Sequence, residues 1–350
     1  MRRPRVRTTL AALALTLVAA TVLGVSLGPV RIPPLRTASI VWQSLRSREP
    51  IAADDTETRI VRDVRLPRVA LAGLVGLALA AAGTVMQGIF RNPLAEPYLL
   101  GLSSGATMGA ALMIALGIDR LIPLALPAAA FAGSLLAVAI VYRLGRSALG
   151  LGDSATLVLA GVALSALFAS ITSFCIVISN PDQTRGIVFW MMGGLAGAQW
   201  NAVWPVLAIV AICTPVLLAF ARDLDALALG EAMAAHLGVN PAWVQKALLV
   251  TAALMTAACV AAVGTIGFIG LIVPHALRLV VGPHHRSLLP AASLAGASLL
   301  IACDTAARTI ARPAEIPVGI LTALLGAPFF LFLLRRSSAA ARRAWGAEVG

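Results

Sequence analysis

The segment from Val69 to Met86 reads VALAGLVGLALAAAGTVM and contains no charged residue. The segment from Val206 to Phe220, VLAIVAICTPVLLAF, has the same character. A transmembrane helix needs about 20 apolar residues in succession, whereas a transmembrane strand needs about 10 that alternate between apolar and polar. Neither segment alternates, and over such a length only a helix satisfies its own backbone hydrogen bonds in lipid. The two segments therefore predict an all-α polytopic membrane protein.

The composition of the whole chain supports this prediction. Of 350 residues, 59% are apolar and 12% are charged, whereas soluble domains have about 45–50% apolar and about 25% charged residues. One soluble core cannot bury such an excess, because the buried fraction grows slowly with chain length. The composition excludes a soluble enzyme, a disordered protein and a disulfide scaffold. The four cysteines each sit singly in apolar segments and are typical of small buried hydrophobic residues.

Similar apolar segments recur along the chain and predict about ten transmembrane helices. They cover residues 8–28, 67–89, 98–117, 121–142, 154–178, 203–221, 243–263, 266–281, 287–303 and 315–334. A shorter apolar stretch near 186–198 predicts a half-helix or a re-entrant segment rather than a further span. We expect a single transmembrane domain over residues 1–350, with the first span and an external loop in residues 1–64 and a cytoplasmic tail in residues 335–350.

The charges favour one orientation of these spans. The net charge of +12 comes from 27 basic residues, all but Lys246 being arginine, against 15 acidic ones. With both termini in the cytoplasm, fifteen basic residues fall on the cytoplasmic side and twelve on the other side, a modest bias in the expected direction. No basic run is interleaved with aromatic residues, so we expect a lipid bilayer and no nucleic acid among the partners.

Two pairs of residues suggest an internal repeat. Gly83-Thr84 is followed nine residues later by Pro93, and Gly264-Thr265 is followed nine residues later by Pro274. Because the two pairs lie five spans apart, a repeat would relate spans 2–5 to spans 7–10 in opposite orientation, as in many transporters. Chance coincidence of two glycines and two prolines is the alternative.

Sequence motifs for chemistry are absent. The chain has no GxxxxGK[ST] phosphate-binding loop, no HExxH metal motif and no Ser/His/Asp set, so we expect no catalytic residue and no metal ligand. Acidic residues inside the apolar segments are scarce, although an ion-coupled transporter needs them. These absences favour a transport subunit that uses energy supplied by another chain, and leave an ion-coupled secondary transporter as the alternative.

Two polar segments interrupt the apolar pattern. Residues 91–97, RNPLAEP, form a proline-bracketed break between the second and third spans. Residues 223–241 contain two short helical pieces broken at Gly230 and Gly238, too short and too polar to cross lipid. This second segment is either a solvated loop or a rigid docking element for a cytoplasmic partner.

Three long segments resemble a known family. They are residues 65–106 (RLPRVALAGLVGLALAAAGTVMQGIFRNPLAEPYLLGLSSGA), 264–290 (GTIGFIGLIVPHALRLVVGPHHRSLLP) and 314–334 (AEIPVGILTALLGAPFFLFLL). They are similar to the FecCD-type (BtuC-type) permease subunits of type II ABC importers, which take up vitamin B12, haem and ferric siderophores. The resemblance extends over spans two to ten, whereas residues 1–64 carry little of it.

The resemblance implies an assembly. Two permease copies would form a homodimer with the translocation path at their interface, in a bacterial cytoplasmic (inner) membrane. Two cytoplasmic ATPase subunits would bind ATP and Mg, so this chain would need no cofactor, and an extracytoplasmic binding protein would deliver the cargo. The docking arginines of the family match Arg65 and Arg68 in RLPR, and Arg308 in DTAAR.

The resemblance also implies the moving parts. Residues 223–241 match the family's cytoplasmic coupling helices, with Gly230, Glu231 and Gly238 in the matching turn. Asn92, Pro93 and Leu94, together with Ser154, match a region near the cytoplasmic gate. We expect alternating access driven by the partner ATPase, with an iron chelate (haem or a ferric siderophore) as cargo and cobalamin as the alternative.

Overall fold

The computed structural model describes residues 3–30, 32–46, 55–147, 150–151, 154–311 and 313–348. The first half contains α1 (Arg3–Ser26), α2 (Pro34–Arg46), α3 (Thr56–Arg59), the π-helical turn η1 (Ile60–Arg65), α4 (Leu66–Ile89), the 3₁₀ turn η2 (Pro97–Leu100), α5 (Leu102–Ala115), α6 (Ile118–Leu121) and α7 (Ala125–Gly145). A two-residue antiparallel hairpin follows, β1 (Arg146–Ser147) and β2 (Gly150–Leu151). The second half contains α8 (Ser154–Ile178), α9 (Pro181–Met191), α10 (Trp200–Ala219), α11 (Ala221–Ala228), α12 (Glu231–His236), α13 (Pro241–Val263), α14 (Ile269–Val281), α15 (His285–Ile310) and α16 (Val318–Glu348).

The helices confirm the predicted all-α membrane architecture. Among the described residues, seven helices are long and apolar enough to cross a membrane, and three shorter apolar helices accompany them. Each of these ten overlaps one of the predicted spans. The largest differences between the helices and the predicted spans are at two C-terminal ends: α15 continues to Ile310, and α16 continues to Glu348 through the segment expected to form a tail.

The predicted half-helix at 186–198 is displaced toward the N-terminus. Helix α9 begins at Pro181 because Asn180 and Gln183 form a capping box, in which each side chain accepts a hydrogen bond from the backbone N–H of the other. The helix ends at Met191, just before Gly193, which has a φ of 65°.

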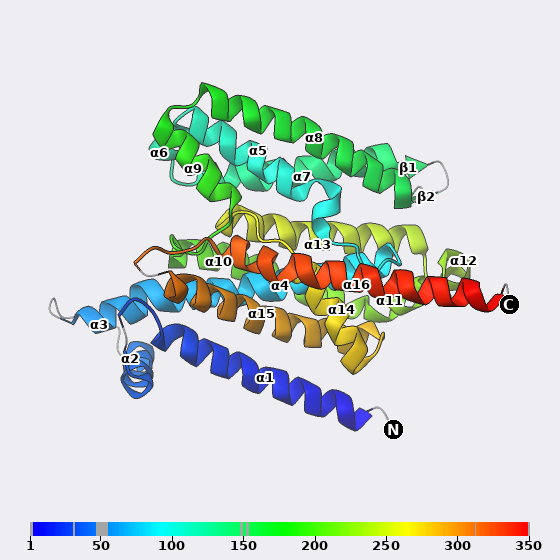
Figure 1. Ribbon diagram of the computed structural model, residues 1–350, viewed down its shortest axis with the longest axis horizontal. Helices are drawn as coiled ribbons and strands as arrows, with labels where there is room; N and C mark the ends of the chain where they lie inside the picture. Colours follow the sequence, from blue (N-terminus) through cyan, green and yellow to red (C-terminus); the bar gives the residue numbers. More distant parts are fainter. Residues whose placement is uncertain are drawn as a thin grey trace.

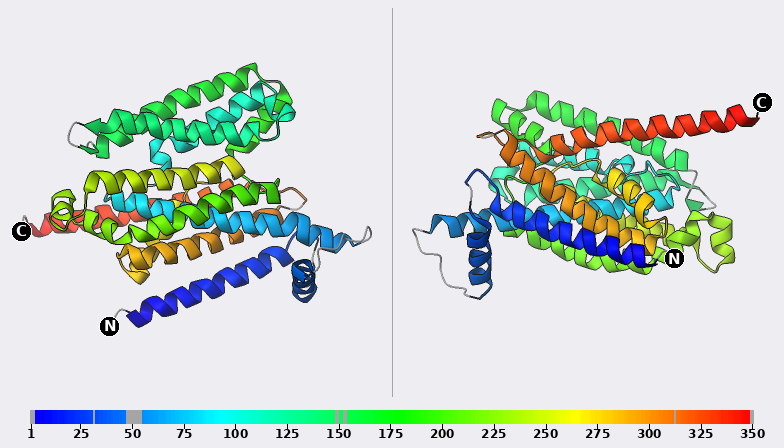
Figure 2. Two further views of the ribbon diagram at one scale, coloured as in Figure 1. Left: turned by 180° about the vertical axis from the view of Figure 1, so that it is seen from behind. Right: turned by 60° about the horizontal axis from the view of Figure 1, so that its bottom comes forward.

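The helices lie in layers (Figure 1). Helices α5, α7 and α8 form one layer, and α4, α10 and α13 form a second layer beside it, with α15 and α1 beyond. Helix α4 occupies the centre, because it packs against α10, α13, α14 and α15. The start of α1, the end of α16 and helix α12 all lie at one end of the bundle, whereas α3, α6 and α9 lie at the other (Figures 1 and 2).

Two half-length helices each follow a link, and the two links touch. Helix α4 is followed by a non-helical stretch and the short α5, and α13 is followed by residues 264–268 and the short α14. The two links touch, because the Tyr98 hydroxyl donates to the Ile266 carbonyl at 3.0 Å and accepts from its N–H at 3.3 Å. This matched order of elements is what the predicted inverted repeat requires, and the repeat itself stays a prediction.

Candidate functional site

The three arginines expected to dock a binding protein lie together where α4 begins and α15 ends. Arg65, Arg68 and Arg308 are only 2%, 6% and 3% exposed. Arg68 contacts Asp304 through Nε at 3.0 Å and Nη2 at 2.9 Å, and its Nη1 donates to Glu315 Oε2 at 2.9 Å. The structure therefore buries these guanidinium groups inside the chain.

The remaining contacts join this cluster to α1. Arg308 Nε lies 3.4 Å from Asp304 Oδ2, and its Nη2 donates to the carbonyl of Gly24. Arg65 Nη1 donates to the carbonyls of Val25 and Ser26 at 2.8 and 2.7 Å. Asp304 and Glu315 supply two negative charges to three positive ones, so the cluster holds α1, α4 and α15 together by charge-assisted hydrogen bonds. Their docking role stays a prediction.

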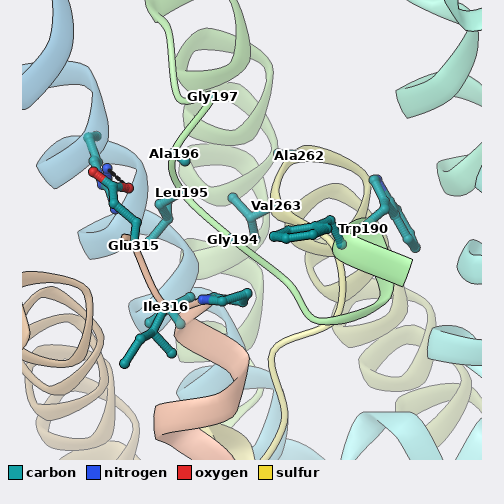
Figure 3. Close-up of a pocket in the computed structure, with 13 residues that line it drawn as sticks. Trp190, Gly194, Leu195, Ala196, Gly197, Ala262, Val263, Glu315 and Ile316 are labelled. Carbon is teal, nitrogen blue, oxygen red and sulfur yellow. Dashed lines mark hydrogen bonds and ion pairs between the residues drawn. The ribbon is translucent and has the colours of Figure 1, made fainter. Parts of the chain in front are cut away.

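A pocket of about 360 Å³ adjoins the Arg68–Glu315 pair. Figure 3 shows Trp190 and Glu315 on opposite sides of it, with the 194–197 backbone and Val263 between them. Its lining is apolar apart from the ion pair, and its volume lies within the usual range of ligand sites, about 300–1,000 Å³. The pocket can receive an apolar group that arrives beside a carboxylate or a cation.

The segment expected to couple to the ATPase forms two short helices at the opposite end of the bundle. Helices α11 and α12 meet at Gly230, whose φ of 109° glycine adopts without the strain that other residues would meet. Gly238 after α12 also has a positive φ, 83°. Glu231 Oε1 accepts a hydrogen bond from Gln245 Nε2 at 3.0 Å, which fixes α12 to α13. The exposed side of the segment carries apolar side chains that water does not favour, Leu229, Met233 and Leu237.

An acidic side chain anchors α11 to the first turn of α15. Asp225 Oδ1 lies 2.9 Å from the backbone nitrogen of His285 and 2.6 Å from its Nδ1. Burial alone would raise the pKa of Asp225, but the hydrogen bonds from the His285 side chain and backbone outweigh it and hold this pKa below its usual value. Asp225 is therefore a carboxylate at neutral pH, and movement of α11 is transmitted to α15.

The turn expected near the gate lies beside this segment. Asn92 Oδ1 accepts a hydrogen bond from the Leu94 N–H at 2.9 Å, which closes an Asx turn around Pro93. A Cβ placed on Gly230 would lie 3.8 Å from Nη1 of Arg91, so the turn and the coupling segment are neighbours. Ser154, the fourth expected gate residue, is the first residue of α8, and its side chain lies outside the described part of the chain.

A second cavity of about 360 Å³ lies between α5 and α8 and reaches the link at Thr265. Its α8 wall consists of Ser165, Ala169, Thr172, Ser173 and Ile176. Helix α8 corresponds to the fifth predicted span, residues 154–178.

The comparisons with known proteins agree with this architecture. A family model described as the FecCD transport family matches residues 15–336. The chain belongs to the FecCD transport family. This FecCD chain is 46% identical over 281 residues to the cobalamin import system permease protein BtuC of Halobacterium salinarum, covering 80% of this chain and 74% of that one. It is 44% identical over 296 residues to the hemin transport system permease protein HmuU of Yersinia pestis, covering 84% and 88%.

A solved structure extends the similarity to the fold. It is an inward-facing conformation of an ABC transporter assigned to the metal-chelate type, with a TM-score of 0.81 and 33% identity, covering 94% of the FecCD chain and 99% of its own. The FecCD chain is thus a multi-pass membrane permease subunit of an ABC importer, and ATP hydrolysis resides in a separate partner chain. This decides between the two transporter classes that the residues alone left open.

Three features of the FecCD chain were missed from the sequence. Asp304 and Glu315 were not identified as partners of the arginines, although the spacing of Asp304 and Arg308 is that of an ion pair on one helix face. The Asp225–His285 contact has no local signal, because the two residues are far apart in sequence. The hydroxyl groups of α5 and α8 did not stand out in the sequence, because most of their neighbours are apolar.

Proposed function

We propose that this FecCD permease moves a large metal chelate across a bacterial cytoplasmic (inner) membrane. The observation that carries the proposal is the family match over residues 15–336, together with relatives named for cobalamin and hemin import. An iron chelate, haem or a ferric siderophore, is the first cargo in this proposal, and cobalamin is the second.

The path lies at the interface of a homodimer and is lined in part by α8. The cavity between α5 and α8 has room for part of such a cargo. Helices α8 and α16 leave large apolar side chains exposed, among them Leu159, Phe174 and Leu324. In a membrane, a second copy or lipid covers such side chains, so these surfaces agree with a dimer.

The segment α11–α12 docks onto the ATPase subunits and transmits their movement. Its exposed apolar side chains, its rigid link to α15 through Asp225 and its position beside the Asn92–Leu94 turn support this role. ATP binding in the partner would shift α12, and the turn at the end of α4 would move with it. Because the start of α1 and the end of α16 lie at the same end as α12, both termini are cytoplasmic in this proposal (Figure 1).

The binding protein docks at the opposite end, near Arg65, Arg68 and Arg308. The part of this cluster that a partner reaches most easily is Glu315, whose side chain is 33% exposed. Arg65→Lys with Arg308→Lys keeps both buried positive charges but removes guanidinium hydrogen bonds, and it is expected to lower stimulation by the binding protein while basal ATPase activity persists. Loss of basal activity in the same variant would assign the arginines to the fold alone.

Uptake by a strain that lacks this chain tests the cargo. Labelled haem, a ferric siderophore and cobalamin are supplied in parallel, with the strain complemented by the wild-type chain as the control. Loss of one chelate alone names the cargo and supports an importer, whereas normal uptake of all three contradicts the proposed function.

A further inference from the structure

The cavity between α5 and α8 is lined mainly by hydroxyl groups. Eight of its eleven lining residues are Ser, Thr or Tyr, and the other three are Ala169, Ile176 and Met191. Within the described part of the chain, no charged side chain lines it. The polar contacts that this cavity can offer a cargo therefore depend on the direction of the hydroxyl hydrogen bonds.

Six of the eight hydroxyls have a backbone carbonyl of the chain itself as an acceptor for their proton. The pairs are Tyr98 with Ile266, Ser104 with Gly101, Thr107 with Ser103, Thr172 with Phe168, Ser173 with Ala169, and Thr265 with Met191. On α8 these bonds are 2.9 Å long and bind each proton to the preceding helical turn. A hydroxyl has one proton and two lone pairs, so such a group can face the cavity only as an acceptor.

The two other lining hydroxyls belong to Ser103 and Ser165. The Ser104 hydroxyl lies 3.0 Å from the Gly101 carbonyl oxygen and 3.0 Å from Ser165 Oγ, and its single proton serves one of these two acceptors. Ser165 keeps its own proton. Ser103 and Ser165 are then the two lining hydroxyls, among the described residues, with a proton to offer.

We infer that this cavity favours chelates whose periphery donates hydrogen bonds, such as primary amides or hydroxyls, over chelates that present carboxylates. This inference rests on the proposed function, because it takes the cavity to be part of the path, and among the proposed cargoes it favours cobalamin or a siderophore without carboxylates over haem. A carboxylate that leaves water here meets mostly oxygen lone pairs and finds few donors, so most of its desolvation is uncompensated. An amide N–H₂ group meets acceptors and keeps its hydrogen bonds.

The direct test compares cobalamin, which carries peripheral primary amides, with a derivative in which one amide is hydrolysed to a carboxylate. The strain lacking this chain is complemented with the wild type, with Thr172→Val plus Ser173→Ala, or with Ser170→Ala. Ser170 is the matched control, because it lies on α8, donates to Ala166 in the same way at 2.9 Å and does not line the cavity. The binding protein is the same in all strains, so its own preference cancels when uptake ratios are compared.

We expect the wild type to import the amide form in preference, and the double variant to reduce the amide-to-carboxylate uptake ratio about threefold to tenfold. Ser170→Ala should keep the wild-type ratio. An unchanged ratio in the double variant overturns the inference. Cobalamin, a ferric siderophore without carboxylates, ferric citrate and haem are also supplied to the deletion strain. Loss of ferric citrate or haem uptake alone overturns the inference but leaves the importer standing, whereas normal uptake of all four overturns both.

Discussion

Asp304 lies between two arginines in a part of the bundle that water hardly reaches. Its carboxylate is 1% exposed and contacts both Arg68 and Arg308. Three buried guanidinium groups repel one another, and each needs a negative partner to offset its desolvation. Asp304 is therefore the residue on which this end of the fold depends most.

Asp304→Asn should lower the free energy of unfolding by about 3–5 kcal/mol, because it leaves buried arginines without their counter-charge. Thermal unfolding of the purified chain in detergent measures this effect. Glu57→Gln is the control, since Glu57 pairs with Arg36 at the surface, where both side chains are nearly half exposed and solvent screens the pair. Equal losses in the two variants would contradict the role given to Asp304.

At the residue scale, the resemblance gave Arg65, Arg68 and Arg308 one role but predicted neither their proximity nor their burial. RLPR and DTAAR are far apart in the chain, and the structure places the three arginines in one cluster. Both properties depend on how α1 packs against α4 and α15, which no local pattern encodes. The docking role itself stays a prediction.

At the scale of elements, glycines determine how closely α4 approaches its neighbours. A Cβ on Gly76 would lie 2.2 Å from the Gly296 carbonyl oxygen of α15, and one on Gly83 would lie 2.0 Å from the Gly270 oxygen of α14. Such contacts let backbones pack directly, as is common in membranes, where burial of apolar side chains drives little association. The central position of α4 depends on these two approaches.

Gly76→Ala should destabilise the chain by about 1–3 kcal/mol, because α4 and α15 must separate to admit the methyl group. Gly73→Ala, one turn earlier on α4, is the matched control: its nearest contact would be the Ile301 side chain at 3.4 Å, an ordinary van der Waals distance. Thermal unfolding in detergent compares the two variants. Loss of stability in both, or in neither, would show that the close approach of the backbones is not what matters.

The turn between α11 and α12 gives a prediction about coupling. Gly230→Ala places a side chain at a φ of 109°, which costs about 1–3 kcal/mol and tilts α12 away from its docked position. Uptake should fall severalfold while the amount of assembled chain in the membrane is unchanged. Gly186→Ala on α9 is the control, because a Cβ there would lie 3.7 Å from the Ile114 side chain, an ordinary van der Waals distance. Wild-type uptake by Gly230→Ala would show that coupling does not depend on the geometry of this turn.

Most elements followed from the sequence because long apolar runs fix spans directly. The ten predicted spans and the break between α11 and α12 all have counterparts in the structure. The displaced α9 and the hairpin β1–β2 were not predicted, since caps and short turns contribute little to an apolar pattern. The short α14 was predicted three residues too long at its start, because residues 266–268 are apolar but non-helical.

In the whole molecule, the proposed transport requires the two ends of the bundle to act together. The buried charge cluster lies at one end and the α11–α12 segment at the other, and α4 and α15 connect them.

Glu231→Arg should abolish chelate uptake, because it breaks the hydrogen bond to Gln245 and reverses the charge beside the proposed ATPase contact. Glu231→Gln, which can still bond Gln245, should retain most of the uptake. Equal uptake by the two variants would show that Glu231 does not contribute to coupling.

The most direct measurement reconstitutes the chain with its ATPase partner and its binding protein in lipid vesicles. Labelled chelate is added outside together with the binding protein, and ATP is enclosed inside. We expect the chelate to accumulate inside the vesicles, and we expect this accumulation to require ATP and to cease with Glu231→Arg. Accumulation without ATP, driven by an imposed proton or sodium gradient, would contradict it.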